Sequence, residues 1–210
     1  MGWLVNAVAA SHAVYLPQAM PGREDCEREL ERLAEHAFEY RYYYRWLKSQ
    51  LVDFLADTVL PRKLAERLPA PMLIAYLYRL GSLDGVGYEG GFLVNKFNRK
   101  RIDLKLLVEA FEKVAKLRRE MKKILTSLDA WCGGVEPRMC PEQVRKYVEL
   151  LEELWEVGIN PNYIFRDLRM LARYRPREVP KALRVIGELK LVERDLLRCL
   201  IRWYVEGGRR

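Results

Sequence analysis

Apolar residues recur at alternating steps of four and three through residues 24–60, a stretch that contains neither proline nor glycine until Pro61. The seam consists of Cys26, Leu30, Leu33, Ala37, Tyr40, Tyr44, Leu47, Leu51 and Phe54. This spacing places all of them on one side of an α-helix, so it predicts a single helix of about 35 residues, or about 50 Å. Pro61 is expected to end that helix.

A second apolar seam predicts another long helix, over residues 102–131. Its members are Leu104, Leu107, Phe111, Val114, Met121, Leu125 and Leu128. The run Cys132-Gly133-Gly134 stops the pattern. Prolines and glycines divide the remaining chain into shorter stretches with helical spacing. They predict helices at 61–68, 70–80, 141–157, 161–174 and 179–205.

Glycines and basic residues mark the connection at 81–101, the one place where the sequence favours a β-hairpin. Residues 85–90 read Gly-Val-Gly-Tyr-Glu-Gly and match the G-x-G-x-x-G pattern formally. A dinucleotide site, however, needs a helix that opens at the last glycine. An apolar run follows here instead, so we interpret the glycines as a flexible loop that allows close approach to a partner.

Together these patterns predict a mainly α-helical, all-α protein. We expect an elongated multi-helix bundle with two long helices, several short ones and a glycine-rich central loop that includes a possible small β-hairpin. The organisation expected is one continuous domain. It consists of an N-terminal segment (1–22), a long-helix region with its basic loop (23–131) and a C-terminal helical region (132–210).

The N-terminal stretch 3–16 is apolar but too short to span a bilayer, and Asn6, Ser11 and His12 interrupt it. Two interpretations remain open for it: a short helix in the core, or an apolar arm that docks into a neighbouring subunit. The first residues lack the basic start of a secretory signal. We therefore expect the protein in a virion or in the cytoplasm or nucleoid.

Uncharged polar residues are scarce, with two Thr, four Ser, three Gln and five Asn in 210 residues. Few amides combined with 31% charged residues is typical of hyperthermophilic proteins, so we expect a hot-growing organism or its virus as the source. Such organisms tolerate intracellular disulfides. Cys132 and Cys140 could therefore pair across a Gly/Pro loop, whereas Cys26 and Cys199 are expected to be reduced, buried thiols.

The net charge of +8 is distributed unevenly along the chain. Residues 1–90 hold ten basic and twelve acidic side chains, whereas residues 91–128 hold eleven basic and four acidic ones. A second basic cluster, at 166–184, has seven basic and two acidic residues, and residues 135–160 between the two clusters carry a net charge of −3. This segregation indicates a polyanion bound on one side of the molecule.

Both clusters contain basic residues at helical spacing. Arg166, Arg169 and Arg173 share one helix face, as do Lys116, Arg119 and Lys123. Such stripes suit the phosphate backbone of a nucleic acid, because Lys and Arg gain affinity there by releasing counterions without reading a base. The candidate phosphate-binding residues are Lys96, Arg99, Lys100, Arg101, Lys116, Arg119, Lys123, Arg166, Arg169, Arg173, Arg175 and Arg177. The alternatives are a solvated surface and an acidic protein or lipid partner.

Aromatic residues are consecutive at 42–44 in the first long helix, where they point in several directions. Tyr42, Tyr43 and Trp46 cannot all face the seam, so some must meet another helix, another subunit or nucleic acid. These three residues and the apolar Trp3, Leu4 and Val5 are the candidates for self-association.

Residues that carry out catalysis or bind metal are few. The chain has two His and four Ser, and it lacks the Walker, G-x-S-x-G, H-E-x-x-H and C-x-x-C patterns. We therefore expect no enzyme activity, no cofactor, no metal and no small-molecule substrate. The leading hypothesis is a structural protein that self-assembles on double-stranded DNA and packages it through sequence-independent phosphate contacts, as a nucleocapsid or chromatin-like coat does. The alternative is a helical adaptor subunit of a larger complex with no direct nucleic-acid role.

Overall fold

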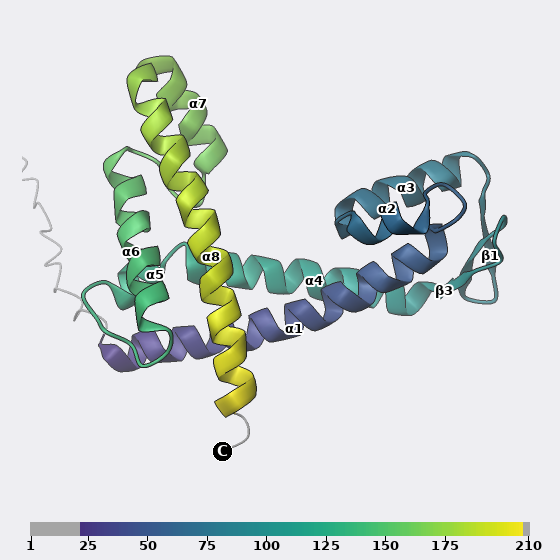
Figure 1. Ribbon diagram of the computed structural model, residues 1–210, viewed down its shortest axis with the longest axis horizontal. Helices are drawn as coiled ribbons and strands as arrows, with labels where there is room; N and C mark the ends of the chain where they lie inside the picture. The colour runs from purple at the N-terminus through teal and green to yellow at the C-terminus, as the bar shows by residue number, and fades with distance from the viewer. Residues whose placement is uncertain (1–21, 208–210) are drawn as a thin grey trace, which may run out of the picture.

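The computed structural model describes residues 22–207 and confirms a mainly α-helical fold with a small antiparallel sheet. Its elements are α1 (Arg23–Leu55), α2 (Arg62–Arg67), α3 (Ala70–Ser82), β1 (Val86–Glu89), β2 (Phe92–Asn95), β3 (Arg101–Asp103), α4 (Leu104–Leu125), α5 (Leu128–Cys132), α6 (Pro141–Glu156), α7 (Ile164–Tyr174), a 3-10 turn η1 (Pro176–Glu178) and α8 (Val179–Gly207). The helices α1 and α4 run side by side as a rod between two ends, and α8 crosses that rod steeply (Figure 1).

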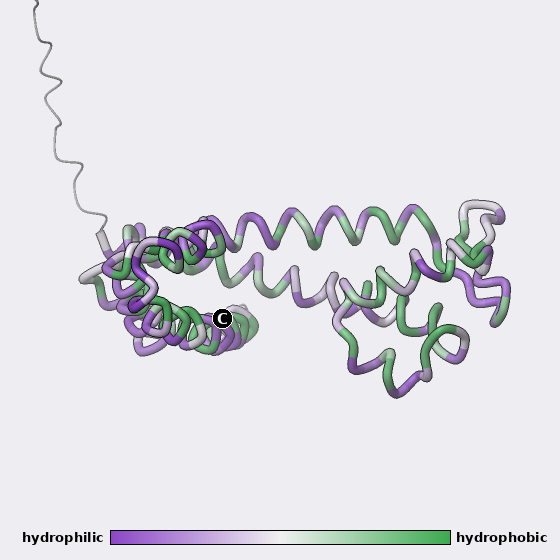
Figure 2. The backbone as a smooth tube through the Cα atoms, turned by 90° about the horizontal axis from the view of Figure 1, so that it is seen from above, coloured by the Kyte–Doolittle hydropathy of each residue, from purple (hydrophilic) through white to green (hydrophobic). Residues whose placement is uncertain are grey.

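Two separate hydrophobic cores lie at the two ends of the rod (Figure 2). The disulfide-end core joins the first half of α1 to the end of α4 and to α5, α6 and α8, and it includes Leu30, Leu151 and Leu196. The sheet-end core joins the last turns of α1 to α2, α3, the sheet and the start of α4, and it includes Phe54, Leu73 and Ile102. The α1 seam therefore serves both cores.

The α1 seam is buried as predicted except at its centre, where Tyr40 and Tyr44 are half-buried. Between the two cores α4 runs alongside α1 and the end of α8 crosses it, so neither core covers the middle of the rod completely (Figure 1). The aromatic residues fill this region, and the rings of Tyr40 and Tyr44 stack with centroids 5.6 Å apart.

Helix α1 ends at Leu55, five residues before the predicted end at Leu60. The side-chain amide of Asn95 donates to the Phe54 carbonyl at 2.6 Å, and the amide of Asn98 donates to the carbonyls of Phe54 and Ala56, both at 3.2 Å. These carbonyls belong to the last turn of the helix, whose backbone acceptors have no intrahelical partner. Side chains from the end of β2 and from the β2–β3 connection thus satisfy carbonyls at the end of α1, ahead of Pro61.

The predicted helix over 102–131 is wrong at both ends. Ile102 lies in β3, and Asp103 caps α4 by accepting a hydrogen bond from the Leu106 N–H at 3.0 Å. At the other end α4 stops at Leu125, residues 126–127 are not helical, and a separate helix, α5, begins at Leu128. Leu125 and Leu128 are buried on either side of the break, which explains why the apolar spacing continues through it and conceals it.

The expected β-hairpin is present and belongs to a three-stranded antiparallel sheet in the order β1-β2-β3. Val86 pairs with Asn95 and Leu93 pairs with Ile102. The turn between β1 and β2 is made by Gly90 and Gly91, whose φ angles of 52° and 91° favour glycine. The interpretation of residues 85–90 as a flexible loop is wrong, because Val86–Glu89 form β1 and pair with β2. A strand, not a helix, follows the G-x-G-x-x-G run.

Both cysteine predictions are wrong. Cys132 is bonded to Cys26 and Cys140 to Cys199, so Cys132 and Cys140 do not pair, and Cys26 and Cys199 are not free thiols. The first bond joins α1 to α5, and the second joins the start of α6 to α8. Because the partners are 106 and 59 residues apart in sequence, local spacing could not identify them.

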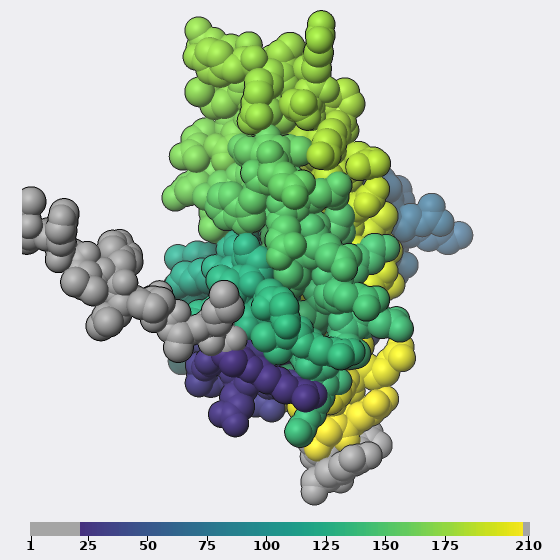
Figure 3. Space-filling view, turned by 90° about the vertical axis from the view of Figure 1, so that its left-hand side faces the viewer, coloured from purple at the N-terminus to yellow at the C-terminus, as the bar shows by residue number. Residues whose placement is uncertain are grey.

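The C-terminal helices α6, α7 and α8 agree with the predicted ones to within three residues at each end. Figure 3 views the disulfide end along the rod, where α6 covers the middle of the face and α7 with the start of α8 extends beyond it. None of the helices between residues 22 and 207 is long and apolar enough to cross a membrane. The N-terminal arm of the prediction lies outside the described residues.

Candidate nucleic-acid interface

The predicted phosphate-binding residues fall into three groups along the molecule. The first group lies at the sheet, the second on the C-terminal half of α4 and the third on α7 and the turn after it. Helix α4 begins directly after β3 and its last turns reach the start of α7, where Lys122 Nζ donates to the Asn162 carbonyl at 3.3 Å (Figure 1). The three groups therefore follow one another from one end of the protein to the other.

Two of the four cations of the sheet group form ion pairs, and the other two do not in the described part of the chain. Lys96 Nζ lies 2.8 Å from an Asp84 oxygen, and an Arg101 guanidinium nitrogen lies 2.9 Å from a Glu89 oxygen. Arg99 and Lys100 are exposed in the β2–β3 connection and form no ion pair within the described part of the chain. The hydrogen bonds from Asn95 and Asn98 to the end of α1 fix this connection, so Arg99 and Lys100 project from an ordered surface.

The α4 group lies on the solvent side of its helix. Lys116, Arg119 and Lys123 are exposed, whereas Leu117 and Met121 turn toward the protein. Lys123 Nζ lies 3.2 Å from Glu120, and the hydrogen bond from Lys123 holds the pKa of Glu120 below its ordinary value. Among residues 22–207, no carboxylate pairs with Lys116 or Arg119, so the stripe has more positive than negative charge.

The α7 group is the most regular of the three. Leu171 is buried, and Arg166, Arg169 and Arg173 are exposed on the side of α7 that faces away from it. Arg166 Nε lies 2.8 Å from Asp167, and this hydrogen bond raises the pKa of Arg166 and lowers that of Asp167. The Arg166 guanidinium also lies 4.3 Å from the centroid of the Tyr163 ring. Cation–π contact of this kind holds a guanidinium without neutralising it.

Arg175 and Arg177 differ from the α7 stripe that precedes them. A guanidinium nitrogen of Arg175 donates to the Val157 carbonyl at 3.2 Å, at the end of α6. A Cβ on Gly158 would lie 2.5 Å from that guanidinium, so the contact depends on the glycine. Arg175 thus has a structural role in joining α6 to the turn after α7, whereas Arg177 is exposed.

The sequence analysis did not select several exposed residues that adjoin these groups. Phe97 lies beside Arg99, and Phe165, which is 88% exposed, precedes Arg166. Aromatic rings next to arginine can stack on bases or support a guanidinium. Arg118 and Lys122 lie in the same basic segment of α4, but they line a cavity and do not belong to the stripe. Their i, i+4 spacing was visible in the sequence, but the cavity that they line was not.

Acidic residues are concentrated elsewhere. Helix α6, which occupies the middle of the face seen in Figure 3, exposes Glu142, Glu149, Glu152 and Glu156. The exposed side of α6 thus has more acidic than basic residues, whereas the stripes on α4 and α7 are mainly basic.

The candidate self-association residues separate into three sets. Tyr42, which is 65% exposed, and Trp46 line a concave surface of about 600 Å³ between the middle of α1 and the end of α8, together with Phe38 and Val205. Tyr43 instead lies beside α4, with Lys113 Nζ 5.7 Å from its ring centroid. Trp3, Leu4 and Val5 lie outside the described residues.

No group of three or more potential metal ligands occurs among residues 22–207. His36 lies on α1, and His12 is outside the described range. No family model, curated protein or solved structure matches this chain. The function is therefore inferred from the geometry of its surfaces.

Proposed function

We propose that this protein is a structural, non-enzymatic nucleic-acid-binding protein that coats double-stranded DNA through phosphate contacts without reading sequence. The observation that carries the proposal is the pair of outward basic stripes, on α7 and on the second half of α4. Both stripes lie on the solvent sides of helices whose opposite sides are fixed in the disulfide-end core.

The dimensions of the stripes fit a phosphate backbone. Seven residues separate Lys116 from Lys123, a rise of about 10 Å along a helix. A duplex presents about six phosphate charges over that distance. The guanidinium groups of the α7 stripe can contact phosphate oxygens in a bidentate manner. Neither stripe contains the Asn or Gln side chains that read adenine in the major groove, so we expect similar affinity for all sequences.

Assembly along the DNA is the second part of the proposal. The concave aromatic surface formed by Phe38, Tyr42 and Trp46 with the end of α8 contains large apolar side chains that water covers in the single chain. Exposed aromatic clusters of this kind are typical of protein–protein contacts. A copy of the same protein on an adjacent stretch of DNA is the partner that the coat model requires.

The test is the salt dependence of binding to short duplexes of two unrelated sequences, measured by fluorescence anisotropy. If each α7 arginine neutralises one phosphate, the triple variant Arg166→Ala/Arg169→Ala/Arg173→Ala lowers the slope of log affinity against log salt by about three units. The loss should be equal for both sequences.

The matched control removes the same amount of positive charge elsewhere. Arg138→Ala/Arg145→Ala/Lys146→Ala changes three exposed cations in and next to the acidic helix α6 and should leave the slope within about one unit of the unchanged protein. Equal slopes for all three proteins would contradict the proposal. Sedimentation with and without nuclease then tests assembly, since a coat forms large particles only with DNA and an adaptor subunit remains a small species.

A further inference from the structure

A cavity of about 660 Å³ opens where the end of α4, the start of α7 and the first half of α8 meet. Its walls are mainly apolar and include Met121, Leu125, Leu168, Ile186 and Leu189. The volume lies within the range of small-molecule sites, which also combine apolar walls with a few polar groups. The cavity lies beside the α4 stripe and shares Arg166 with the α7 stripe.

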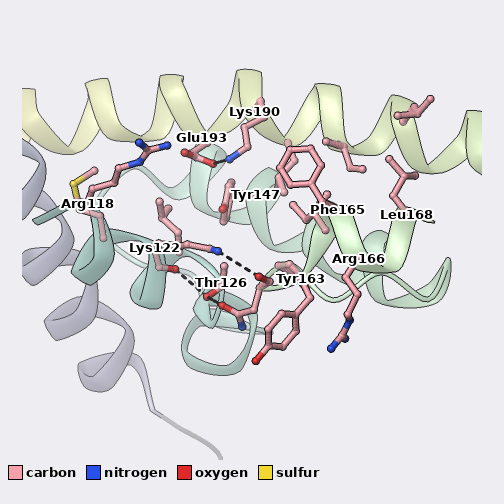
Figure 4. Close-up of a pocket in the computed structure, with 18 residues that line it drawn as sticks. Arg118, Lys122, Thr126, Tyr147, Tyr163, Phe165, Arg166, Leu168, Lys190 and Glu193 are labelled. Atoms are coloured by element: carbon pink, nitrogen blue, oxygen red, sulfur yellow. Dashed lines mark hydrogen bonds and ion pairs between the residues drawn. The ribbon is translucent and has the colours of Figure 1, made fainter. Parts of the chain in front are cut away.

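Tyr147 from α6 lines the back of this cavity (Figure 4). Only 2% of the residue is exposed. Burial raises the pKa of Tyr147 far above its ordinary value, so the hydroxyl remains protonated. A protonated tyrosine hydroxyl in the lining of a cavity can donate a hydrogen bond to a ligand bound there.

The cations around the cavity are only partly neutralised. Lys190 Nζ lies 2.6 Å from Glu193, and Arg166 is paired with Asp167 as described above. Arg118 and Lys122 have no carboxylate partner in the described part of the chain, and Lys122 donates only to the Asn162 carbonyl. Two positive charges without a carboxylate partner therefore line the same cavity as Tyr147.

Charge and apolar surface are separated along the cavity. In Figure 4, Arg118 and Lys122 lie toward one end, Phe165 and Leu168 lie toward the other, and Tyr147 is between them. This polarity matches a molecule with one anionic end and one apolar end. A phosphodiester backbone has no apolar chain to cover Leu168 or Ile186, so nucleic acid does not explain the site.

We propose that the cavity binds a single-chain amphipathic anion, a free long-chain carboxylate. The carboxylate accepts hydrogen bonds from the Tyr147 hydroxyl and from Lys122 and Arg118, and the alkyl chain lies against Leu168, Ile186 and Leu189. Charge-assisted hydrogen bonds hold the headgroup, and burial of apolar surface holds the chain. This inference does not depend on nucleic-acid binding, because Arg118, Lys122 and Tyr147 belong to neither basic stripe.

The experiment is calorimetric titration of the full-length protein with laurate below its micelle concentration, in the absence of DNA. We expect saturable binding of one laurate per chain, weaker binding of dodecanol and no binding of inorganic phosphate. Arg118→Gln/Lys122→Gln should weaken laurate binding by about tenfold to a hundredfold, and Tyr147→Phe by about threefold to tenfold.

The matched control is Lys116→Gln/Arg119→Gln, which removes the same charge from the outer side of α4 and should bind laurate like the unchanged protein. Leu168→Trp, which fills the apolar end without changing a charge, should abolish binding. Circular dichroism verifies that each variant is folded. The proposal is overturned if laurate does not saturate at one per chain, if dodecanol binds equally well, or if the cavity and control variants weaken binding equally.

Discussion

The two ends of the molecule share α1 and α4 but are held together by different chemistry. At the disulfide end, two covalent bonds join α1 to α5 and α6 to α8 around a helical core. At the sheet end the described structure contains no disulfide, and Asn95, which is fully buried, joins the sheet to the last turn of α1. The disulfide end therefore has cross-links that also restrict the unfolded chain, whereas the sheet end depends on native contacts alone.

The two ends also carry different candidate surfaces. Both the α7 stripe and the cavity belong to the disulfide end, where Tyr147 lies on α6 and a disulfide joins the start of α6 to α8. The basic residues of the sheet end instead lie on a connection held by hydrogen bonds. If the two ends unfold independently, destabilising one end should remove its phosphate-binding surface and leave the surface at the other end intact. If α1 makes them one cooperative unit, they should be lost together.

The largest effect is expected from removal of the long-range disulfide. Cys26→Ala/Cys132→Ala opens a loop with a sequence separation of 106 residues. Closing a loop of about that length stabilises a protein by about 4–5 kcal/mol in the chain-entropy account. Urea unfolding should show a loss of this size, and hydrogen exchange should locate it in α5, α6 and α8. Equal loss of protection in α2 and α3 would show that the ends are not separable.

The next largest effect is expected at the sheet end. Asn95→Ala removes the donor to the Phe54 carbonyl and the acceptor for the Phe97 N–H, which is 3.0 Å away. The Phe54 carbonyl keeps the Asn98 amide at 3.2 Å, but the Phe97 N–H loses its acceptor and the buried amide leaves a cavity. Together these losses should cost about 2–3 kcal/mol. The exposed Asn162, at the other end, provides the control, and Asn162→Ala should cost about 0.5 kcal/mol. Urea unfolding measures the loss of stability in both variants. Similar losses would contradict the conclusion that the buried hydrogen bonds of Asn95 stabilise the sheet end.

Smaller changes in stability, of opposite sign to each other, are expected from alanine substitutions at two glycines near the sheet end. A Cβ on Gly85 would lie 2.5 Å from Leu80 and 2.7 Å from Phe97, whereas a Cβ on Gly81 would meet nothing within 4 Å. Gly85→Ala should therefore destabilise the sheet end by about 1–3 kcal/mol. Gly81→Ala, inside α3, should stabilise it by up to about 1 kcal/mol. Thermal unfolding measures the stability of both variants. Melting-temperature changes of the same sign would refute the close packing at Gly85.

The smallest effect concerns acid sensitivity at the disulfide end. The hydrogen bonds from Arg166 and from the Asn160 N–H lower the pKa of Asp167. The ionised carboxylate therefore stabilises the folded state above the ordinary carboxyl pKa, and this contribution disappears as pH falls through the lowered value. The melting temperatures of the unchanged protein and of Asp167→Asn should differ near pH 7 and converge near pH 2. A melting-temperature difference that does not change with pH would exclude this contribution. Arg166→Ala, which removes one of the two hydrogen bonds to Asp167, should make the pH dependence of the difference smaller.

The sequence predicted much of the fold because helix formation is governed by spacing along the chain. The steps of four and three residues identified the buried side of α1, and the prolines located α6, α7 and α8. The same reasoning placed Arg166, Arg169 and Arg173 on one face. It failed at residues 102–103 and 126–127, where a strand and a break interrupt the predicted helix over 102–131 without changing the apolar spacing.

The sequence by itself thus determined which residues share a helix face and where positive charge is concentrated, since both follow from local order along the chain. The tertiary structure alone decided that Cys26 meets Cys132, that Asn95 ends α1 and that Tyr147 faces a cavity beside Lys122. Each of these relations joins residues from different elements. Their proximity depends on how the helices cross, and the crossing is set by the packing of both cores together and not by any one segment.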